Sequence, residues 1–133
     1  MNHKKLAIVV EDNRIMREII AKALVWDGAW DIVKAADGAE ALASVGRPGV
    51  GLVIVDWKMV GMDGLECTRR IRSGANGNDP RLPVILVTAA GAELTDEMAR
   101  AAGVDCLLRK PFTLIQLHSA IRQVTGDGVE PAV

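Results

Sequence analysis

The sequence lacks the features that mark several large classes of protein. Its 133 residues include no tyrosine, one phenylalanine and two histidines. Lys and Arg number 16 and Asp and Glu number 17, which gives a formal net charge of −1. This balance argues against nucleic-acid binding, because domains that bind nucleic acids usually carry a basic surface. We therefore expect no DNA-binding domain in this chain.

Long hydrophobic runs are also missing. No apolar stretch approaches the roughly 18–20 residues that a transmembrane helix needs. The apolar segment before Glu11 spans only residues 6–10, which is too short for the hydrophobic part of a signal peptide. We therefore expect a cytoplasmic protein that does not associate with a membrane.

Cysteine is scarce, and its two copies show no metal-binding pattern. Cys67 and Cys106 lack the close spacing of a zinc motif, and His3 and His118 do not complete a credible set of ligands. We expect both cysteines to be buried, reduced packing residues.

The remaining composition is that of one globular domain. Half of the residues are hydrophobic and a quarter are charged. A chain of this length buries about two-thirds of its unfolded surface, which is enough for a core without disulfides or metals. We expect one domain over residues 1–125 and a short flexible tail over 126–133, where glycine and proline recur.

Short apolar runs alternate with amphipathic stretches along the chain. The runs are continuous, as in strands of a parallel sheet with both faces buried. A less apolar run carries Lys34, which suits a strand at an edge of the sheet. The sequence predicts strands near residues 6–11, 31–35, 52–56, 84–88 and 105–109.

Apolar residues at helical spacing follow each predicted strand. A further stretch near 93–102 reads as a helix that ends at Gly103. Alternating strands and helices predict a parallel sheet with right-handed crossovers, and five strands are too few for a closed barrel. The fold class is therefore α/β, an open doubly wound five-stranded parallel sheet with five helices. The stripes are Met16, Ile19, Ile20, Ala23 and Leu24; Leu42 and Val45; Leu65, Thr68 and Ile71; Leu94, Met98 and Ala102; and Leu114, Leu117, Ile121 and Val124.

Polar side chains stand at the ends of four predicted strands. They are Glu11 and Asp12, then Asp56, then Thr88, then Lys110. The carboxyl ends of parallel strands share one edge of an open sheet, where ligands bind. Three carboxylates, a hydroxyl and an ammonium group should therefore meet in one crevice.

Three carboxylates that lie close together need a counter-charge. Two unit charges about 4 Å apart repel by about 4 kcal/mol at an effective dielectric constant near 20. Oxygen ligands favour a hard cation, which points to Mg²⁺ and to phosphoryl chemistry. Asp56 is the candidate nucleophile, and Lys110 and Thr88 would contact the phosphoryl oxygens. Any one of these residues alone would have an ordinary explanation, such as a helix cap. Their joint occurrence at four strand ends carries the prediction.

These motifs together resemble the receiver domain of two-component response regulators. The resemblance covers about residues 5–125 and implies the flavodoxin-like strand order 2-1-3-4-5. It rests on Glu11-Asp12, on Asp56 with Met59 and residues 61–64, on Thr88-Ala89, and on Lys110-Pro111-Phe112.

The resemblance implies a role for each matching residue. Asp56 would be the phosphoacceptor, and Glu11, Asp12 and the backbone carbonyl of Lys58 would hold Mg²⁺ with it. Thr88 and Lys110 would contact the phosphoryl group, and Ala89, which follows Thr88, would also line that site. Gly64 matches the glycine at the turn into the third helix, and Lys110–Pro111 occupies the position of the family's cis peptide.

The implied function is that of a stand-alone receiver in a phosphorelay. The donor would be a phosphohistidine on a histidine kinase or a phosphotransfer protein. The chain would catalyse only its own phosphorylation and slow dephosphorylation, as a monomer or weak dimer. The alternative is an atypical receiver that acts mainly as a protein-interaction module. Candidate contacts for the partner are Arg14, Met16, Arg17, Trp57 and Met59.

Two positions and one loop depart from the family's pattern. Val60 stands where the family usually has proline, so we expect a more mobile loop at that place. Leu107 stands where an aromatic residue is common, so the usual aromatic switch is absent. The loop over residues 73–82 is long and rich in glycine.

Other phosphate-handling classes fit the sequence less well. A haloacid-dehalogenase-type phosphohydrolase would need a second aspartate where Lys58 stands. A flavodoxin-like flavin module needs a phosphate-binding loop after the first strand, where Glu11 and Asp12 would repel phosphate. No Walker loop is present, and the glycine pair at 49 and 51 precedes a strand, unlike a dinucleotide-binding turn.

Overall fold

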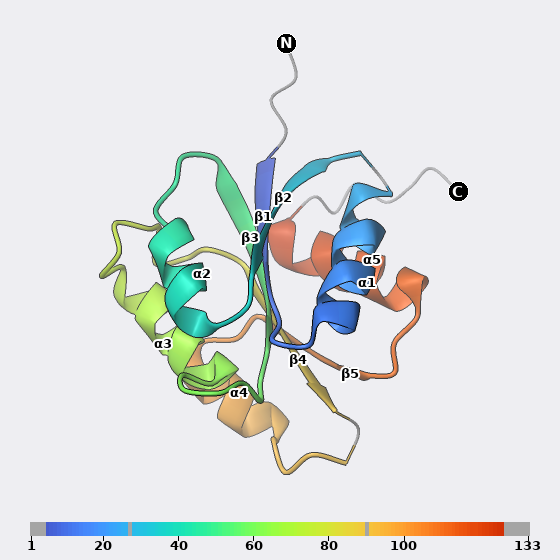
Figure 1. Cartoon of the computed structure of the whole chain (residues 1–133). Helices are drawn as coiled ribbons and strands as arrows, with labels where there is room; N and C mark the ends of the chain where they lie inside the picture. Colours follow the sequence, from blue (N-terminus) through green and yellow to red (C-terminus); the bar gives the residue numbers. More distant parts are fainter. Residues whose placement is uncertain (1–4, 27, 90, 127–133) are drawn as a thin grey trace.

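A single parallel sheet of five strands forms the centre of the computed structural model, which describes residues 5–26, 28–89 and 91–126. The strand order is β2-β1-β3-β4-β5, which confirms the predicted topology (Figure 1). The strands are β1 (Lys5–Val10), β2 (Trp30–Ala35), β3 (Val50–Asp56), β4 (Val84–Ala89) and β5 (Cys106–Lys110). Their boundaries differ from the predicted ones by up to two residues, and Glu11 lies just beyond β1.

Five helices cover the two faces of the sheet. The helices α2, α3 and α4 lie on one face, and α1 and α5 lie on the other (Figure 1). Every crossover therefore follows the doubly wound pattern that was predicted. The helices are α1 (Arg14–Val25), α2 (Gly38–Ser44), α3 (Gly64–Ser73), α4 (Asp96–Ala102) and α5 (Leu114–Thr125).

The alternation of side chains along β1 explains why its apolar run is continuous. Ala7 and Val9 pack into the core formed with α1 and α5, whereas Ile8 and Val10 pack into the core formed with α2, α3 and α4. All four side chains are buried. A strand with helices on both faces has no solvent-facing side, so it has no place for polar residues.

The helix stripes were predicted less accurately than the strands. Ile19, Met98 and Leu114 were assigned to buried stripes, but all three are exposed. The predicted helix at 93–102 begins only at Asp96, because the side chain of Thr95 accepts a hydrogen bond from the Met98 N–H and caps the helix there. Its predicted end at Gly103 is confirmed, with a φ of 98° that favours glycine.

The two cysteines differ in their surroundings. Both are free thiols. Cys67 is buried as expected, and burial raises the pKa of its thiol to about 11. The prediction was wrong for Cys106, which is only half-buried because it begins β5, a strand at the edge of the sheet.

The loop after α3 is held by polar side chains. The Asn78 amide donates to the carbonyl oxygens of Ile71 and Asp79. The Arg72 guanidinium donates to the carbonyl oxygens of Pro80 and Leu82. The glycine-rich segment therefore has a defined path back to β4.

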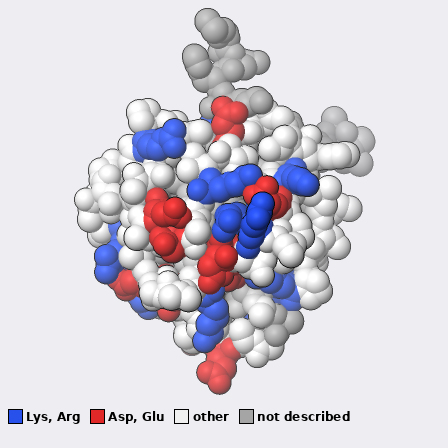
Figure 2. Space-filling model, in the orientation of Figure 1, with Lys and Arg blue, Asp and Glu red and all other residues white. Residues whose placement is uncertain are grey.

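Two findings concern the expectations that the chain has no transmembrane helix and no basic surface for nucleic acids. In the described part of the chain, none of the helices is long and apolar enough to cross a membrane. On the face seen in Figure 2, acidic and basic side chains are interleaved without a large area of one sign. Most of the tail predicted at 126–133 lies outside the described residues.

Candidate functional site

The structure brings the predicted polar residues together at one edge of the sheet. Asp56 and Lys110 are the last residues of β3 and β5, and Thr88 is the last but one of β4. Carboxylate oxygens of Glu11, Asp12 and Asp56 lie within 4.8 Å of one another. The Lys110 Nζ lies 3.2 Å from Asp56 Oδ1 and 3.3 Å from Glu11 Oε1.

Two of the three carboxyl groups are almost removed from water. Glu11 is 1% exposed and Asp56 is 8% exposed, whereas Asp12 is exposed. Burial raises the pKa of Asp56 above its usual range, and the neighbouring Lys110 only partly offsets this. Burial also raises the pKa of Glu11, against the hydrogen bond from the Asn13 N–H, and the charge of Asp56 raises it further. The site therefore favours a cation beside these two groups.

Lys110 supplies one such cation. Burial alone would lower the pKa of its ammonium group, but Asp56 and Glu11 together raise it above the usual value. Lys110 therefore stays charged at neutral pH. One positive charge faces three carboxyl groups, so the cluster keeps an excess of negative charge.

Thr88 carries a polar atom without a partner. Its side chain is 1% exposed, and its hydroxyl makes no hydrogen bond to any described residue. An unpaired buried hydroxyl costs about 1–3 kcal/mol. It is therefore placed to meet an acceptor that enters the crevice.

Three carboxylates form a donor set that suits a hard divalent cation. Their oxygens can converge on one point, and such cations take carboxylate and carbonyl oxygen in preference to nitrogen or sulfur. Lys58 follows Asp56 by two residues, and its side chain is exposed. Ala89 ends β4 and pairs with Lys110 in the sheet register, so it lies at the same edge.

Backbone packing holds Asp56 close to the start of α3. The Trp57 N–H donates to the carbonyl of Val87, and the Gly64 N–H donates to the carbonyl of Trp57. A Cβ at Gly64 would lie 2.5 Å from the Asp56 carbonyl oxygen and 2.6 Å from Leu86 Cδ1. Only glycine allows this approach. The Lys110–Pro111 peptide is cis, as the resemblance implied.

The rim of the site is partly apolar. The Lys58 Nζ lies 4.6 Å from the centre of the Trp57 ring, in a cation–π contact. A hollow of about 300 Å³ opens beside this pair, lined by Trp57, Lys58, Gly91, Ala92 and Glu93. Val60, in place of the usual proline, is exposed on the same loop.

Sequence reasoning missed how Asn13, in the loop after β1, and Arg17, in α1, support Glu11. The Asn13 N–H donates to Glu11 Oε2 at 3.2 Å. Arg17 Nη1 donates to the Glu11 carbonyl oxygen at 2.7 Å. The signal in the sequence was Arg14 and Arg17 in the first turns of a helix, where acidic residues are usual.

Comparison with known families gives one match across almost the whole chain. A family model described as the response regulator receiver domain matches residues 7–122. A chemotaxis protein CheY homolog of Campylobacter jejuni is 34% identical over 122 residues, which cover 91% of this chain and 92% of that protein. A probable transcriptional regulatory protein of Mycobacterium tuberculosis, TcrX, is 32% identical over 115 residues, which cover 86% of this chain and 47% of that protein.

Solved structures with the same fold include one with a metal. The receiver domain of the sensor histidine kinase PA1611 from Pseudomonas aeruginosa holds a magnesium ion in its active-site cleft. It is 29% identical to this chain with a TM-score of 0.81, covering 93% of this chain and 99% of that one. A response regulator receiver protein from Pseudomonas putida is 28% identical with a TM-score of 0.78, covering 92% and 99%.

Proposed function

This chain belongs to the response regulator receiver family of two-component signalling, and on that premise we propose that Asp56 accepts a phosphoryl group. The donor is a phosphohistidine on a histidine kinase or on a phosphotransfer protein. One observation carries the proposal: the Asp56 carboxylate lies 3.2 Å from the Lys110 ammonium, within a sheet edge that also holds the unpaired Thr88 hydroxyl.

Mg²⁺ fits the donor set of this site. Glu11, Asp12 and Asp56 would hold the ion together with the backbone carbonyl of Lys58. The bound ion supplies positive charge that neutralises the carboxylates and the incoming phosphoryl oxygens. A magnesium-bound receiver at 29% identity supports this assignment.

The transfer step forms one bond and breaks another. A carboxylate oxygen of Asp56 attacks the phosphorus atom, and the P–N bond of the phosphohistidine breaks. The electron pair of that bond returns to the ring nitrogen, and the ring, protonated at its other nitrogen, leaves as neutral imidazole. The product is an acyl phosphate on Asp56.

Two side chains and one backbone group would stabilise the charge that moves onto Asp56. The Lys110 ammonium now pairs with Asp56 and would pair with a phosphoryl oxygen after transfer. The Thr88 hydroxyl would donate to a second oxygen and so gain the partner that it lacks. Ala89 would contribute its backbone N–H at the end of β4.

Hydrolysis of the acyl phosphate on Asp56 would end the signal. Water attacks the phosphorus atom, the bond to the Asp56 oxygen breaks, and inorganic phosphate leaves as the carboxylate re-forms. None of the described residues at the site is a histidine that could serve as a general base for this water. We therefore expect slow hydrolysis and no activity on other substrates.

The partner would dock where α1 meets the site. Four apolar side chains of α1 and of the residue after it are exposed: Ile15 at 73%, Ile19 at 52%, Val25 at 58% and Trp26 at 78%. Of these, Ile15, Ile19 and Trp26 are spaced by four and by seven residues. Residues at spacings of four and seven lie on one side of a helix, so these side chains form an apolar stripe along α1. Such a stripe can pack against a helix of the partner. Of the contacts expected from the sequence, Met16 packs partly against the core, so Ile15 is the better candidate.

A small phosphodonor tests the proposal without the partner. Incubation with acetyl phosphate and Mg²⁺ should add one phosphoryl group to the wild type, as measured by intact-protein mass spectrometry. Asp56→Asn should remove the label because an amide is not a nucleophile. Asp63→Asn is the matched control, since Asp63 caps α3 and asparagine caps equally well.

The outcomes separate the competing functions. Labelling of the wild type and of Asp63→Asn, but not of Asp56→Asn, supports the proposal. No label on any protein, with Mg²⁺ present, would favour the interaction module that needs no phosphorylation. Equal labelling of Asp56→Asn would assign the acceptor to another residue.

A further inference from the structure

We infer that Arg17 is a positioning residue for the metal site, through its hold on the loop that carries Asp12. The inference rests on the proposed function, because it concerns the site at which Mg²⁺ would bind. Arg17 touches no metal ligand atom in the structure, so its effect passes through the backbone of the loop between β1 and α1.

Arg17 contacts the loop on both sides of Asp12, with its side chain before Asp12 and with its backbone, as part of the first turn of α1, after it. Its Nη1 donates to the Glu11 carbonyl oxygen at 2.7 Å. Its backbone N–H donates to the Asn13 carbonyl oxygen at 2.9 Å. Asp12 lies between these two residues; it is the exposed carboxylate of the cluster, and its side chain makes no hydrogen bond or ion pair with any described residue. The position of Asp12 therefore depends on how firmly its two neighbours are held.

Other hydrogen bonds fix the two ends of this loop to β2 and to α1. The Glu11 N–H donates to the Ala35 carbonyl at 3.0 Å, which ties the start of the loop to β2. The Asn13 side chain accepts from the Met16 N–H, which ties its end to α1. The bond from the Arg17 guanidinium to the Glu11 carbonyl joins the start of this loop to α1, beside the bond from the Asn13 N–H to Glu11 Oε2 that also spans Asp12.

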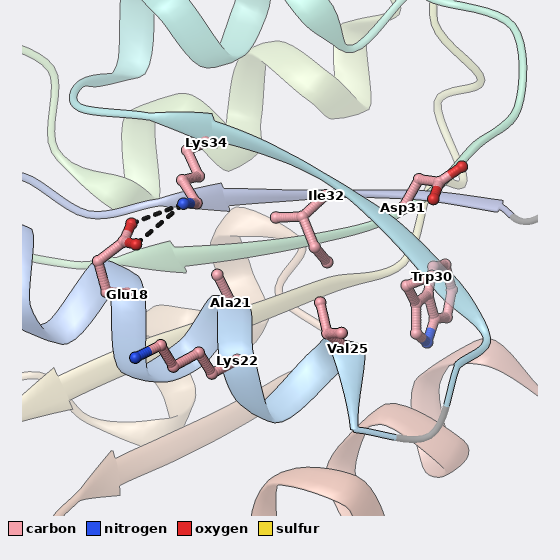
Figure 3. A pocket seen from close by; sticks show the side chains of 8 residues that line it. All are labelled: Glu18, Ala21, Lys22, Val25, Trp30, Asp31, Ile32 and Lys34. Carbon is pink, nitrogen blue, oxygen red and sulfur yellow. Dashed lines mark hydrogen bonds and ion pairs between the residues drawn. The ribbon is translucent and has the colours of Figure 1, made fainter.

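The charge of Arg17 has no obvious role in the stability of α1. The first turn of this helix contains no acidic residue, and a cation near a helix N-terminus opposes the helix dipole. The neighbouring Glu18 could pair with Arg17 but pairs with Lys34 of β2 at 2.8 Å. Figure 3 shows the Glu18 carboxylate directed at Lys34, at the end of a hollow between α1 and β2. Among the described residues, Arg17 makes no ion pair.

Electrostatics and positioning predict opposite effects on metal affinity. If Arg17 acted only as a nearby positive charge, its removal would strengthen the binding of a divalent cation. If Arg17 positions Asp12, its removal would weaken binding, because a ligand that must be ordered on binding costs entropy. The sign of the change in affinity therefore distinguishes the two roles.

Calorimetric titration of the purified protein with Mg²⁺ alone provides the readout. We expect Arg17→Met to raise the Kd about tenfold, the lower end of the effect of removing an outer-shell partner. Arg14→Met is the matched control, since Arg14 is an exposed arginine one turn earlier that makes no ion pair in the described part of the chain. It should leave the Kd unchanged or lower it. Arg17→Lys keeps the positive charge but loses the planar guanidinium group and its fixed N–H donors. Its Kd for Mg²⁺ should lie between those of the wild type and Arg17→Met.

Thermal unfolding without metal, measured beside the titration, separates positioning from general stability. A lower melting temperature for Arg17→Met with an unchanged Kd would overturn the inference, and so would a tighter Kd. If Arg17→Met failed to fold, the Arg17→Lys titration would decide, since a Kd equal to that of the wild type overturns the inference. Failure of the wild type to bind Mg²⁺ would instead refute the proposed function.

Discussion

At the scale of single residues, the site buries charged and polar groups whose burial is unfavourable in the absence of a ligand. Glu11 and Asp56 are nearly out of solvent, and burial is the main reason that the pKa of each lies above its usual range. Thr88 keeps an unpaired hydroxyl beside them. A fold that retains such a cluster gains from a ligand that brings positive charge and hydrogen-bond acceptors.

The raised pKa values predict how stability depends on pH without metal. A carboxyl group with a higher pKa in the folded state binds more protons there than in the unfolded chain. The free energy of unfolding then falls as pH rises from the usual carboxyl range through the raised values. We expect the wild type to gain stability relative to Asp56→Asn as pH is lowered from neutral toward the usual aspartate pKa of about 4, as measured by urea unfolding. A difference between the two proteins that is constant with pH would contradict the assigned shift.

At the scale of elements, Arg72 joins segments that are distant in the sequence. From α3 its guanidinium donates to the Gly103 carbonyl at the end of α4, to the Leu82 carbonyl and to the Asp105 carboxylate. Asp105 Oδ2 also accepts from the Val84 N–H, which begins β4. The starts of β4 and β5 and the end of α4 are therefore fixed by one partly buried side chain.

Replacement of Arg72 should destabilise the fold more than replacement of a surface arginine. Arg72→Met leaves several carbonyl groups without their side-chain donor and Asp105 with only the Val84 N–H, so we expect a loss of about 1–3 kcal/mol in the free energy of unfolding. Arg70→Met is the control, because Arg70 pairs only with the solvated carboxylate of Glu66, and ion pairs at the surface contribute little to stability. Urea unfolding of both variants measures the difference. Equal losses would show that the Arg72 bonds add nothing beyond a surface pair.

The element β5 also bears on how a signal would leave the site. Leu107 is half-buried and packs against the core shared with α4. A leucine can fill that space in either state of Thr88 with little difference in contact, and an equilibrium shifts only by such differences. We expect weak coupling between Asp56 and the surface formed by residues 93–108.

Amide NMR with and without beryllofluoride and Mg²⁺ tests this coupling. The largest chemical-shift changes should lie in the loops after Asp56 and after Thr88. Changes across residues 93–108 should be small. Shifts in that region as large as those around Asp56 would refute weak coupling, and the bond from Arg109 Nη2 to the Leu94 carbonyl would be the first candidate to carry it.

At the scale of the whole molecule, the sheet was predictable and the helix surfaces were less so. Strands buried on both faces leave continuous apolar runs, and residues at their carboxyl ends must share an edge, so the meeting of Asp56 with Lys110 followed from the order of the runs. The exposure of Ile19 did not follow, because a helix on the outside of a sheet can present apolar residues to a partner as well as to the core. The bond from Arg17 to a backbone carbonyl has no counterpart in the hydrophobic pattern, so the sequence did not predict it.

The identity of the phosphorylated residue is the direct test of Asp56 as the phosphoacceptor. Borohydride reduces an acyl phosphate, so an aspartate that carries the phosphoryl group becomes homoserine, and peptide mass spectrometry then locates it. After treatment with acetyl phosphate and Mg²⁺, we predict homoserine at position 56 and unchanged aspartate at positions 12 and 63. Homoserine at either of those positions, or none at position 56 in a protein that mass spectrometry shows to be phosphorylated, would contradict the account.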